Sequence, residues 1–402
     1  MIKEIRITNF YSFSKSQVIL QPDTNILIGI NGSGKSNFLK AVKLLKEGVA
    51  GIGLKKHLLD NLGGFDNIFF KGTNQENNSN SFCLEYIIDG KTISEDNHGF
   101  KFTDDLIYKI TIIKSPSLQN YYVQEVIKNT KGFIYLEFNN GIGILNERVD
   151  PSDNKLKLIK YSDYDSQELV LKEVSDVDRY FALTTLKKAI REIMVYDYFD
   201  TTPKSPIRKP MLSSSERRLL SDGVNLPQIL NTIKINYKQQ YKKIQEMLSE
   251  VNQNFTGFDF NIIGGNIELM LEEQGLGSSV HVSNISDGTL RYLCLLSILY
   301  NPDRGRFICI DEPEVGLHPD MILNIANAIK EASEDSTLVI STHSENLLNY
   351  FNIENVRIFE KNEDNSTKVV RFNEKDFSSW YADYSLGQLW KQGYLGGVRY
   401  GN

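Results

Sequence analysis

Apolar residues in the first third of the chain recur at every second position, and this period predicts β-strands. Two alternating runs and one continuous apolar run that ends in glycine open the chain: residues 2–7, 17–20 and 24–30. The same period extends from residue 82 to about residue 145 and is interrupted by turns such as Asp89-Gly90. This region therefore predicts antiparallel hairpins. The polar segments on either side of it, 74–80 and 151–165, predict loops.

Helical spacing of apolar residues appears at 40–56 and over most of 169–255, where the proline-rich segment 202–210 interrupts it. The clearest pattern is one helix that contains residues 230–251, whose apolar positions step by threes and fours. Such a stripe faces either the core or a partner helix. We favour the core, because the stripe spans only about three heptads.

Strands and helices alternate after a hairpin around Gly264-Gly265-Asn266. The predicted elements are helix 288–300, strand 306–310, helix 319–332, strand 337–341 and a helix from residue 344. This alternation predicts a parallel sheet flanked by helices, so the fold class is α/β with an antiparallel β subdomain and a helical insertion. We expect three parts: an N-terminal lobe at 1–165, a helical insertion at 166–256 and a C-terminal lobe at 257–402.

Composition narrows the functional class only slightly. Of the 402 residues, 41% are hydrophobic and 24% are charged, which is typical of globular proteins and not of disordered or fibrous ones. No apolar run could cross a bilayer and the first residues do not resemble a secretory leader, so we expect a cytoplasmic protein without membrane contact. The three cysteines lack metal-ligand spacing, and we expect neither a disulfide nor zinc. The net charge of -6 gives no bulk attraction to nucleic acid, although a local basic face stays possible.

A phosphate-binding loop is predicted where the apolar run 24–30 ends. The segment Gly29-Ile-Asn-Gly-Ser-Gly-Lys-Ser36 matches the full G-x-x-x-x-G-K-[ST] pattern of the Walker A motif. Its glycines let successive N–H groups turn inward around a phosphate, and the following helix presents its positive N-terminal end. Lys35 would reach the β- and γ-phosphates of ATP, and Ser36 would ligate Mg²⁺. We expect the nucleotide to contact Gly29, Asn31, Gly32, Ser33, Gly34, Lys35, Ser36 and Asn37.

Two later strands end in side chains that suit hydrolysis. The apolar run Phe307-Ile-Cys-Ile-Asp-Glu312 ends in two acids, at the edge where parallel sheets bind ligands. Asp311 would hold Mg²⁺ or its bound water, and Glu312 would act as general base on the attacking water. The run Leu338-Val-Ile-Ser-Thr-His343 ends in a histidine that can bond a γ-phosphate oxygen and the same water. A strand-end histidine without a role is the simpler alternative, and the order of the motifs favours the catalytic one.

A second anion-binding helix start precedes these two strands. Ser286, Asp287 and Gly288 lie where the predicted helix 288–300 begins. One subunit does not need two phosphate cradles for one nucleotide. We therefore expect a head-to-tail homodimer in which Ser286 and Gly288 of one chain close over the γ-phosphate that Lys35 of the other chain holds.

This set of motifs resembles the ABC-type ATPase heads, which are P-loop NTPases. The forms Gly-x-Asn-Gly-x-Gly-Lys-Ser and Ser-Asp-Gly-Thr resemble the RecF, SMC and OLD branch of these ATPases. Three further stretches are similar to compact RecF-like bacterial ATPases: 220–226, 311–319 and 386–397. The chain has no Cys-x-x-Cys hook and no long arm, which argues against a chromosome-tethering role.

The resemblance implies an ATP-hydrolysing switch. Two heads would dimerise around ATP and Mg²⁺, and hydrolysis would drive a separately encoded effector, often a nuclease, in bacterial antiphage defence or DNA repair. Two alternatives stay open: a RecF-like protein that binds DNA, and a nucleotide-sensing scaffold with little turnover. This family also uses a Q-loop glutamine that senses Mg²⁺ and γ-phosphate, and Gln75 is a candidate for it.

Two groups of side chains have more than one interpretation. The aromatic residues in Asn9-Phe-Tyr-Ser-Phe13 lie either near the nucleotide base or in the core. A set of basic residues forms either a DNA-facing patch or a solvated helix face, and we favour the solvated face. These basic residues are Arg208, Lys209, Arg217, Arg218, Lys242 and Lys243.

Overall fold

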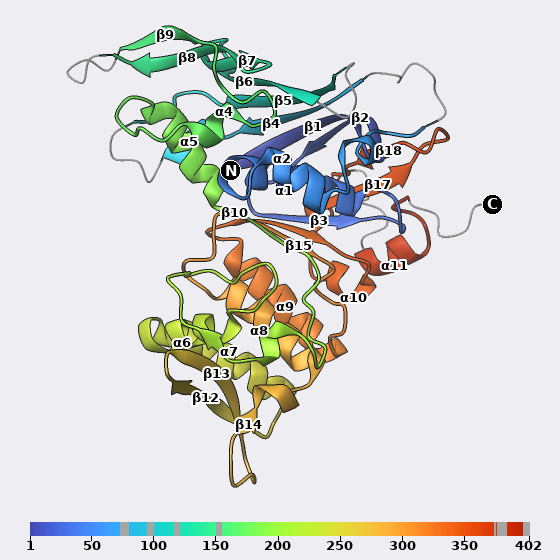
Figure 1. Cartoon of the computed structure of the whole chain (residues 1–402). Coiled ribbons are helices and arrows are strands. Elements are labelled where there is room, and N and C mark those ends of the chain that lie inside the picture. Colours follow the sequence, from blue (N-terminus) through green and yellow to red (C-terminus); the bar gives the residue numbers. More distant parts are fainter. Residues whose placement is uncertain are drawn as a thin grey trace.

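The structure is a computed structural model of the chain, and its elements stack in layers (Figure 1). It describes residues 1–72, 80–94, 100–115, 121–149, 155–373, 375 and 384–396. Over these ranges the strands form three sheets. An antiparallel sheet lies at the top of Figure 1, a mostly parallel sheet crosses the middle, and a small hairpin sheet lies at the bottom.

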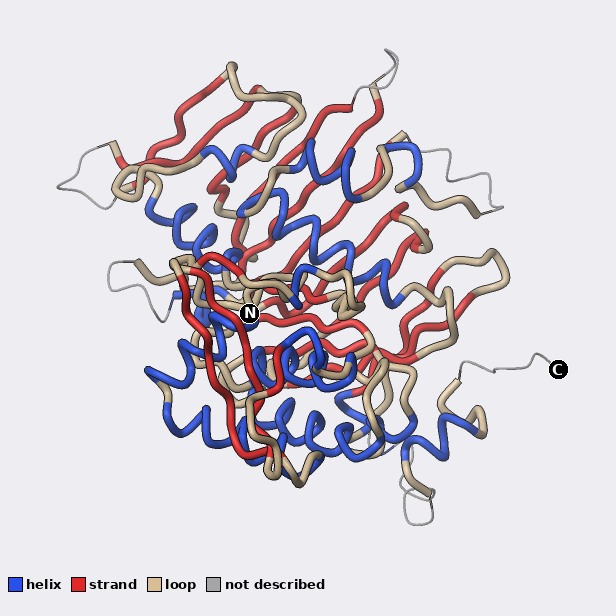
Figure 2. The backbone as a smooth tube through the Cα atoms, turned by 60° about the horizontal axis from the view of Figure 1, so that its bottom comes forward, coloured by secondary structure: helices blue, strands red, loops and turns tan. Residues whose placement is uncertain are grey.

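The antiparallel sheet confirms the predicted hairpins and extends them on both sides. Figure 2 shows its strands side by side as a broad layer. Their order is β2 (Phe13–Ile19), β1 (Ile2–Phe10), β4 (Ser81–Ile88), β5 (Leu106–Lys114), β6 (Tyr121–Asn129), β7 (Ile134–Asn139), β8 (Ile142–Arg148) and β9 (Leu156–Tyr161). The prediction of a loop over 151–165 is wrong where β9 lies. The predicted turn at Asp89-Gly90 is the start of a short helix, α3 (Gly90–Ser94), because the Asp89 carboxylate accepts hydrogen bonds from the amides of Lys91 and Thr92.

The central sheet confirms the predicted parallel arrangement. Its order is β10 (Ile193–Tyr196), β15 (Phe307–Asp311), β16 (Thr337–Ser341), β3 (Thr24–Ile28), β17 (Val356–Lys361) and β18 (Thr367–Val370). These strands pair in parallel, except for the antiparallel β17–β18 pair. The carboxyl ends of β3, β15 and β16 therefore meet at one edge, which is the edge that binds ligands in sheets of this kind.

Both faces of the central sheet are covered, so its strands are apolar at successive positions. Leu27 and Phe307 face the core shared with the antiparallel sheet and with α1 (Lys35–Ala50) and α5 (Phe181–Arg191). Ile26 and Ile308 face the opposite core, which is shared with α8 (Asp287–Leu299) and α9 (Pro319–Ala332). The phosphate loop is thus anchored between two packed layers.

The region predicted as a helical insertion, 166–256, is helical only in part. Its helices are α4 (Val170–Glu173), α5, α6 (Leu226–Asn236) and α7 (Lys238–Val251). The single helix predicted over 230–251 is wrong, because the backbone leaves helical geometry at Tyr237, where φ is -133° and ψ is 68°. The core-facing interpretation is confirmed, since Ile233, Ile244 and Leu248 are buried. Strand β10 of this region joins the central sheet, so a purely helical insertion is wrong, while the domain boundaries stay a prediction.

The remaining elements adjust other predicted bounds. The helix predicted at 40–56 begins earlier, at Lys35, and is followed by α2 (Leu54–Lys56) and a π-helical turn (His57–Asn61). The predicted hairpin is confirmed as β12 (Phe255–Ile263) and β13 (Asn266–Glu273), and β13 also pairs with the short strands β11 (Met211–Leu212) and β14 (Val280–His281). The helix predicted from residue 344 is short, α10 (Glu345–Leu348), and α11 (Leu386–Lys391) follows near the end. Within the described ranges, no helix combines the length and the apolar character that crossing a membrane requires.

Candidate functional site

The predicted phosphate loop connects β3 to α1, in the order that its chemistry requires. Gly34 has a φ of +115°, in the region that favours glycine, and a Cβ there would lie 2.4 Å from the Thr367 hydroxyl oxygen. A Cβ on Gly29 would lie 2.3 Å from the carbonyl oxygen of Phe359. Both positions are therefore closed to larger residues. Along the loop, Asn31, Gly32 and Ser36 are exposed, whereas Ser33 and Lys35 are buried.

The loop is braced by segments far away in the chain. The Thr367 hydroxyl on β18 donates to the carbonyl oxygen of Ser33 at 2.6 Å and lies 2.8 Å from the Ser12 hydroxyl. Asn37 donates its side-chain amide to the same Ser12 hydroxyl at 3.0 Å. Sequence reasoning missed Ser12 and Thr367, because no local pattern links them to the loop.

Lys35 lies among the catalytic candidates. Its Nζ donates to the carbonyl oxygen of Gly29 at 2.9 Å and lies 2.9 Å from Nε2 of His343. An ammonium group only donates, so Nε2 accepts in this arrangement. Burial lowers the pKa of Lys35, and the nearby Glu312, Asp311 and Glu314 carboxylates oppose this by raising it. The cation therefore stays within a cluster of acids at the edge of the sheet.

The two predicted metal ligands also lie together. The Ser36 hydroxyl donates to Oδ2 of Asp311 at 3.1 Å. The other carboxylate oxygen, Oδ1 of Asp311, is buried and has no hydrogen-bond partner among the described residues. No group of three or more His, Cys, Asp or Glu side chains in the described part of the chain is placed to hold a metal. A hydroxyl and one carboxylate suit Mg²⁺, which takes few protein ligands and completes its shell with water and phosphate oxygens.

Glu312 has an unusual backbone conformation. Its φ is +48°, which non-glycine residues rarely adopt, and its amide donates to the carbonyl oxygen of Ser341 at 2.9 Å. Its Oε1 lies 3.4 Å from Nε2 of His343. Strain of this kind gathers at functional sites, where the surrounding structure holds it in place.

Glu314 positions the histidine, and sequence reasoning gave it no role. Its Oε1 accepts from the Thr342 hydroxyl at 2.7 Å and from the backbone amide of His343 at 2.8 Å. Burial raises the pKa of Glu314, against the lowering effect of these hydrogen bonds. The sequence feature that could have indicated this role is the presence of a third carboxylate two positions after Glu312.

The predicted signature residues form a separate helix start. Ser286 is the N-cap of α8, and its Oγ accepts from the amide of Thr289 at 3.2 Å. A Cβ on Gly288 would lie 2.8 Å from the carbonyl oxygen of Gly316, so the helix packs closely on the loop after β15. Among the described contacts, no hydrogen bond or ion pair joins Ser286–Gly288 to the phosphate loop of the same chain. The structure thus brings the phosphate loop together with Asp311, Glu312 and His343, whereas Ser286–Gly288 have no described contact with that loop.

The basic residues considered for DNA do not form one exposed patch. Arg208 is buried and pairs with Asp287, so both interpretations, the DNA-facing patch and the solvated helix face that we favoured, are wrong for it. Arg218 pairs with Glu192, Lys242 with Glu246 and Lys243 with Glu331. The pairing of Arg218, Lys242 and Lys243 with acids offsets part of the positive charge that binding to a phosphate backbone requires.

The other open predictions resolve separately. Phe10 and Phe13 are buried, which confirms the core interpretation for both. Tyr11 is half-buried, and Nζ of Lys40 lies 4.4 Å from the centroid of its ring. The Q-loop candidate Gln75 lies outside the described residues. Cys294 and Cys309 are buried free thiols, and Cys83 is half-buried.

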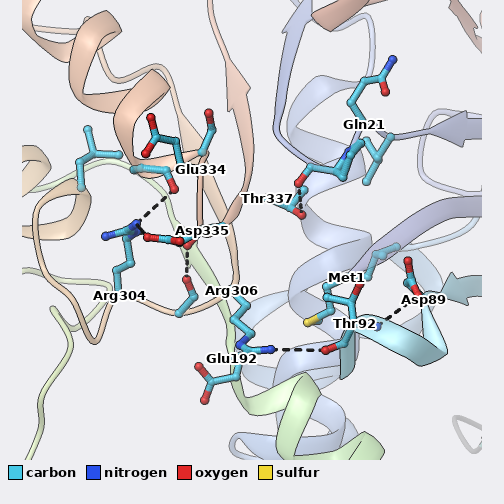
Figure 3. Close-up of a pocket in the computed structure, with 18 of the residues that line it drawn as sticks. Met1, Gln21, Asp89, Thr92, Glu192, Arg304, Arg306, Glu334, Asp335 and Thr337 are labelled. Atoms are coloured by element: carbon cyan, nitrogen blue, oxygen red, sulfur yellow. Dashed lines mark hydrogen bonds and ion pairs between the residues drawn. The ribbon is translucent and has the colours of Figure 1, made fainter. Parts of the chain in front are cut away.

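A cavity of about 1400 Å³ lies at the amino ends of the central strands, opposite the edge that carries the phosphate loop (Figure 3). Arg306 and Thr337, which line it, flank the amino ends of β15 and β16, whereas Asp311 lies at the carboxyl end. Arg304 pairs with Asp335 at 3.4 Å, and Arg306 donates to the carbonyl oxygen of Thr92 at 3.4 Å. Arg304 and Asp335 therefore contact each other in this cavity, which lies away from the phosphate loop.

Comparisons with known proteins decide the family. Residues 24–349 match the family described as "AAA domain, putative AbiEii toxin, Type IV TA system". The chain belongs to this family. The matched range of this AAA-domain family contains the phosphate loop, both strand-end motifs and the start of α8.

Curated relatives of this AAA-domain protein agree with that family. An "ATP/GTP phosphatase" of Helicobacter pylori is 24% identical over 360 residues, which cover 87% of this chain and 86% of the relative. A "DNA replication and repair protein RecF" of Chlamydia caviae is 24% identical over 204 residues, covering 48% of this chain and 55% of that protein. RecF of Thermoanaerobacter sp. is 31% identical over 118 residues, covering 29% and 32%.

Solved structures show the same fold. A crystal structure of the SMC head bound to the C-winged helix domain of ScpA covers 93% of this chain and 99% of its own, with 12% identity and a TM-score of 0.59. The SMC head with an extended coiled coil from Pyrococcus furiosus covers 95% and 98%, with 12% identity and a TM-score of 0.56. The protein is an ABC-type ATPase of the RecF/SMC branch, and its fold is that of a P-loop NTPase.

Proposed function

We propose that the site at the carboxyl edge of the central sheet binds and hydrolyses ATP with Mg²⁺. The observation that carries this proposal is the meeting of Lys35, Ser36, Asp311, Glu312 and His343 at that edge. Two buried oxygens there, Oδ1 of Asp311 and Oγ of Ser33, have no hydrogen-bond partner among the described residues. Unpartnered buried polar atoms of this kind are explained by a ligand or an ion, so the residues fit a nucleotide and its metal.

Each side chain has a role in hydrolysis. The loop amides and Lys35 would hold the triphosphate, while Ser36 and Asp311 would hold Mg²⁺, which would neutralise phosphate charge. Glu312 accepts a proton from water as the water oxygen bonds to the γ-phosphorus and the bond to the β–γ bridging oxygen breaks. Once Lys35 has turned from Nε2 toward the phosphates, His343 in the tautomer that carries its proton on Nε2 donates to a γ-phosphate oxygen. Glu314 keeps His343 in place through its backbone amide.

The second anion-binding helix start supports a dimer with a shared site. Ser286 is exposed, and its described side-chain hydrogen bonds reach Thr289 and not the phosphate loop of its own chain. A partner chain placed head to tail presents Ser286 and Gly288 to the γ-phosphate on Lys35. Binding of ATP therefore favours the closed dimer, and loss of the γ-phosphate on hydrolysis releases it.

A separately encoded effector, of the nuclease class, receives this motion. The family description names a toxin of a toxin–antitoxin system, which is an arrangement of two components, and this supports a distinct partner protein. We place the pair in bacterial antiphage defence or DNA repair, and the relative described as a "DNA replication and repair protein RecF" supports the second of these settings.

The dimer is tested with Glu312→Gln, which retains the shape of the side chain and removes the general base. Size-exclusion chromatography with light scattering should show a stable dimer with ATP and Mg²⁺ and a monomer without them. Lys35→Ala is the matched control and should stay monomeric with ATP. If Glu312→Gln stays monomeric although it binds ATP, the shared site is wrong.

The RecF relatives favour a second candidate, a DNA-binding maintenance protein. That function requires ATP turnover that rises with duplex DNA and binding that weakens steeply with salt. The pairing of Arg218 and Lys243 with acids disfavours it. Turnover measured with and without DNA at two salt concentrations separates the candidates. Very slow turnover under every condition would instead indicate the nucleotide-sensing scaffold.

A further inference from the structure

Arg208 is a buried cation that contacts the loop before α8. It lies in a short turn, Pro206–Arg208, and its side chain is 5% exposed. A charged group this deeply buried is costly unless acceptors surround it. Sequence reasoning placed Arg208 on the surface, so its contacts point to a role that charge pattern alone did not reveal.

The two terminal nitrogens of the guanidinium bind one continuous loop, residues 282–287. Its Nη1 lies 3.0 Å, 3.1 Å and 2.7 Å from the carbonyl oxygens of Val282, Ser283 and Ile285. Its Nη2 donates to Oδ1 of Asp287 at 2.5 Å, and its Nε donates to the carbonyl oxygen of Thr201 at 2.8 Å. Arg208 therefore ties the loop that leads into α8 to the segment that follows β10.

These contacts orient the amide that precedes the helix. In a trans peptide the C=O and N–H groups point in opposite directions. Since the carbonyl of Ile285 points to Arg208, the amide of Ser286 points away from it. Ser286 is exposed and its hydroxyl caps the helix at Thr289, so we take the side of its amide as the one that a phosphate of a partner chain would approach.

Charge gives a second reason for the contact. Asp287 follows the signature serine, and its side chain is 52% exposed. An unpaired carboxylate there would repel a triphosphate. The ion pair with Arg208 offsets that charge and keeps the carboxylate turned toward the protein.

We infer that Arg208 is a positioning residue that prepares Ser286–Gly288 for the nucleotide held by a partner chain. This inference rests on the proposed shared site. Because Arg208 has no described contact with its own phosphate loop, its loss should leave ATP binding by the monomer unchanged. Its loss should lower the turnover of the dimer about tenfold or more, as when a preorganised contact to the transition state is removed.

The test mixes two impaired variants, Arg208→Ala and Lys35→Ala, in equal amounts. Half of the random dimers then contain both chains, and one of their two sites combines an intact phosphate loop with an intact signature loop. Recovery to about a quarter of wild-type activity is expected, since only that site is complete. A mixture of Ser286→Ala with Lys35→Ala is the reference, and Lys204→Ala, an exposed neighbour of Arg208, is the matched control with wild-type activity.

The outcomes are distinct. Recovery in both mixtures supports the inference. Recovery in the mixture that contains Ser286→Ala but not in the mixture that contains Arg208→Ala overturns the role of Arg208 and leaves the shared site intact. Wild-type activity of the unmixed Arg208→Ala variant also overturns the role of Arg208 and leaves the shared site intact. Failure of both mixtures overturns the shared site itself. If Arg208→Ala does not fold, Arg208→Lys, which retains the charge but not the fork of donors, replaces it in the same mixtures.

Discussion

Glu125 provides a quantitative test of how the antiparallel sheet is held to the helices. This carboxyl is buried on β6 and accepts from the Tyr108 hydroxyl at 2.6 Å. It also accepts from the amides of Val170 and Leu171 in α4, at 2.5 Å and 3.3 Å. Burial raises the pKa of Glu125 from 4.5 to about 7, and the hydrogen bonds from Tyr108 and α4 oppose this shift.

The sign of the pH dependence follows from the raised pKa. The folded chain binds the proton more tightly than the unfolded chain, so the stabilisation is complete below about pH 4.5 and is lost as the pH rises through about 7. A shift from 4.5 to about 7 corresponds to about 3 kcal/mol in total. Between pH 5 and pH 8, the free energy of unfolding should therefore fall by about 2–3 kcal/mol because of this group.

Glu125→Gln isolates this contribution, because glutamine does not titrate. Urea unfolding followed by circular dichroism should show that the free energy of unfolding of the wild type, relative to Glu125→Gln, falls by about 2–3 kcal/mol from pH 5 to pH 8. Glu137→Gln, at an exposed position on the neighbouring β7, is the control and should track the wild type. A wild type that gains stability relative to Glu125→Gln over this range would refute the reasoning.

Three further changes test the candidate site. Gly34→Ala should abolish the thermal shift induced by ATP and cost about 1–3 kcal/mol of stability, because its φ is +115° and its Cβ would lie 2.4 Å from a hydroxyl of β18. Gly132→Ala is the control, with a φ of +92° and open space around its Cβ, and an equal loss of ATP binding in both would contradict the account. The free energy of unfolding of Glu312→Gly should exceed that of Glu312→Ala by about 1 kcal/mol, which raises the urea midpoint, because φ at this position is +48°. Equal urea midpoints of the two variants would contradict the strain. Glu314→Ala should lower kcat more than it weakens ATP binding, since the amide of His343 loses its acceptor, and unchanged kcat would exclude this role.

The sequence predicts the local parts of this molecule well. The phosphate loop and the strand ends at Asp311 and His343 are continuous motifs, each with a strand beside it, so their meeting at one sheet edge follows from parallel pairing. The antiparallel hairpins follow from a period of two. Patterns of this kind are complete within a few residues of the chain.

What the sequence does not predict depends on contacts between distant segments. Thr367 braces the loop at Ser33, which precedes it by 334 positions, and no pattern near either residue indicates this. Arginine is usually a surface residue, and the sequence near Arg208 does not indicate its burial. Arg208 is buried because carbonyl groups of another segment of the chain accept its hydrogen bonds. The break at Tyr237 lies inside an uninterrupted apolar stripe, so the tertiary packing and not the local period ends α6 there.

The central claim is that one triphosphate is held by two chains. Its most direct test is the structure of Glu312→Gln crystallised with ATP and Mg²⁺. The account predicts a head-to-tail dimer in which the hydroxyl of Ser286 from one chain lies within hydrogen-bonding distance of the γ-phosphate bound by Lys35 of the other. A nucleotide bound at Lys35 with Ser286 of every copy facing solvent would contradict it.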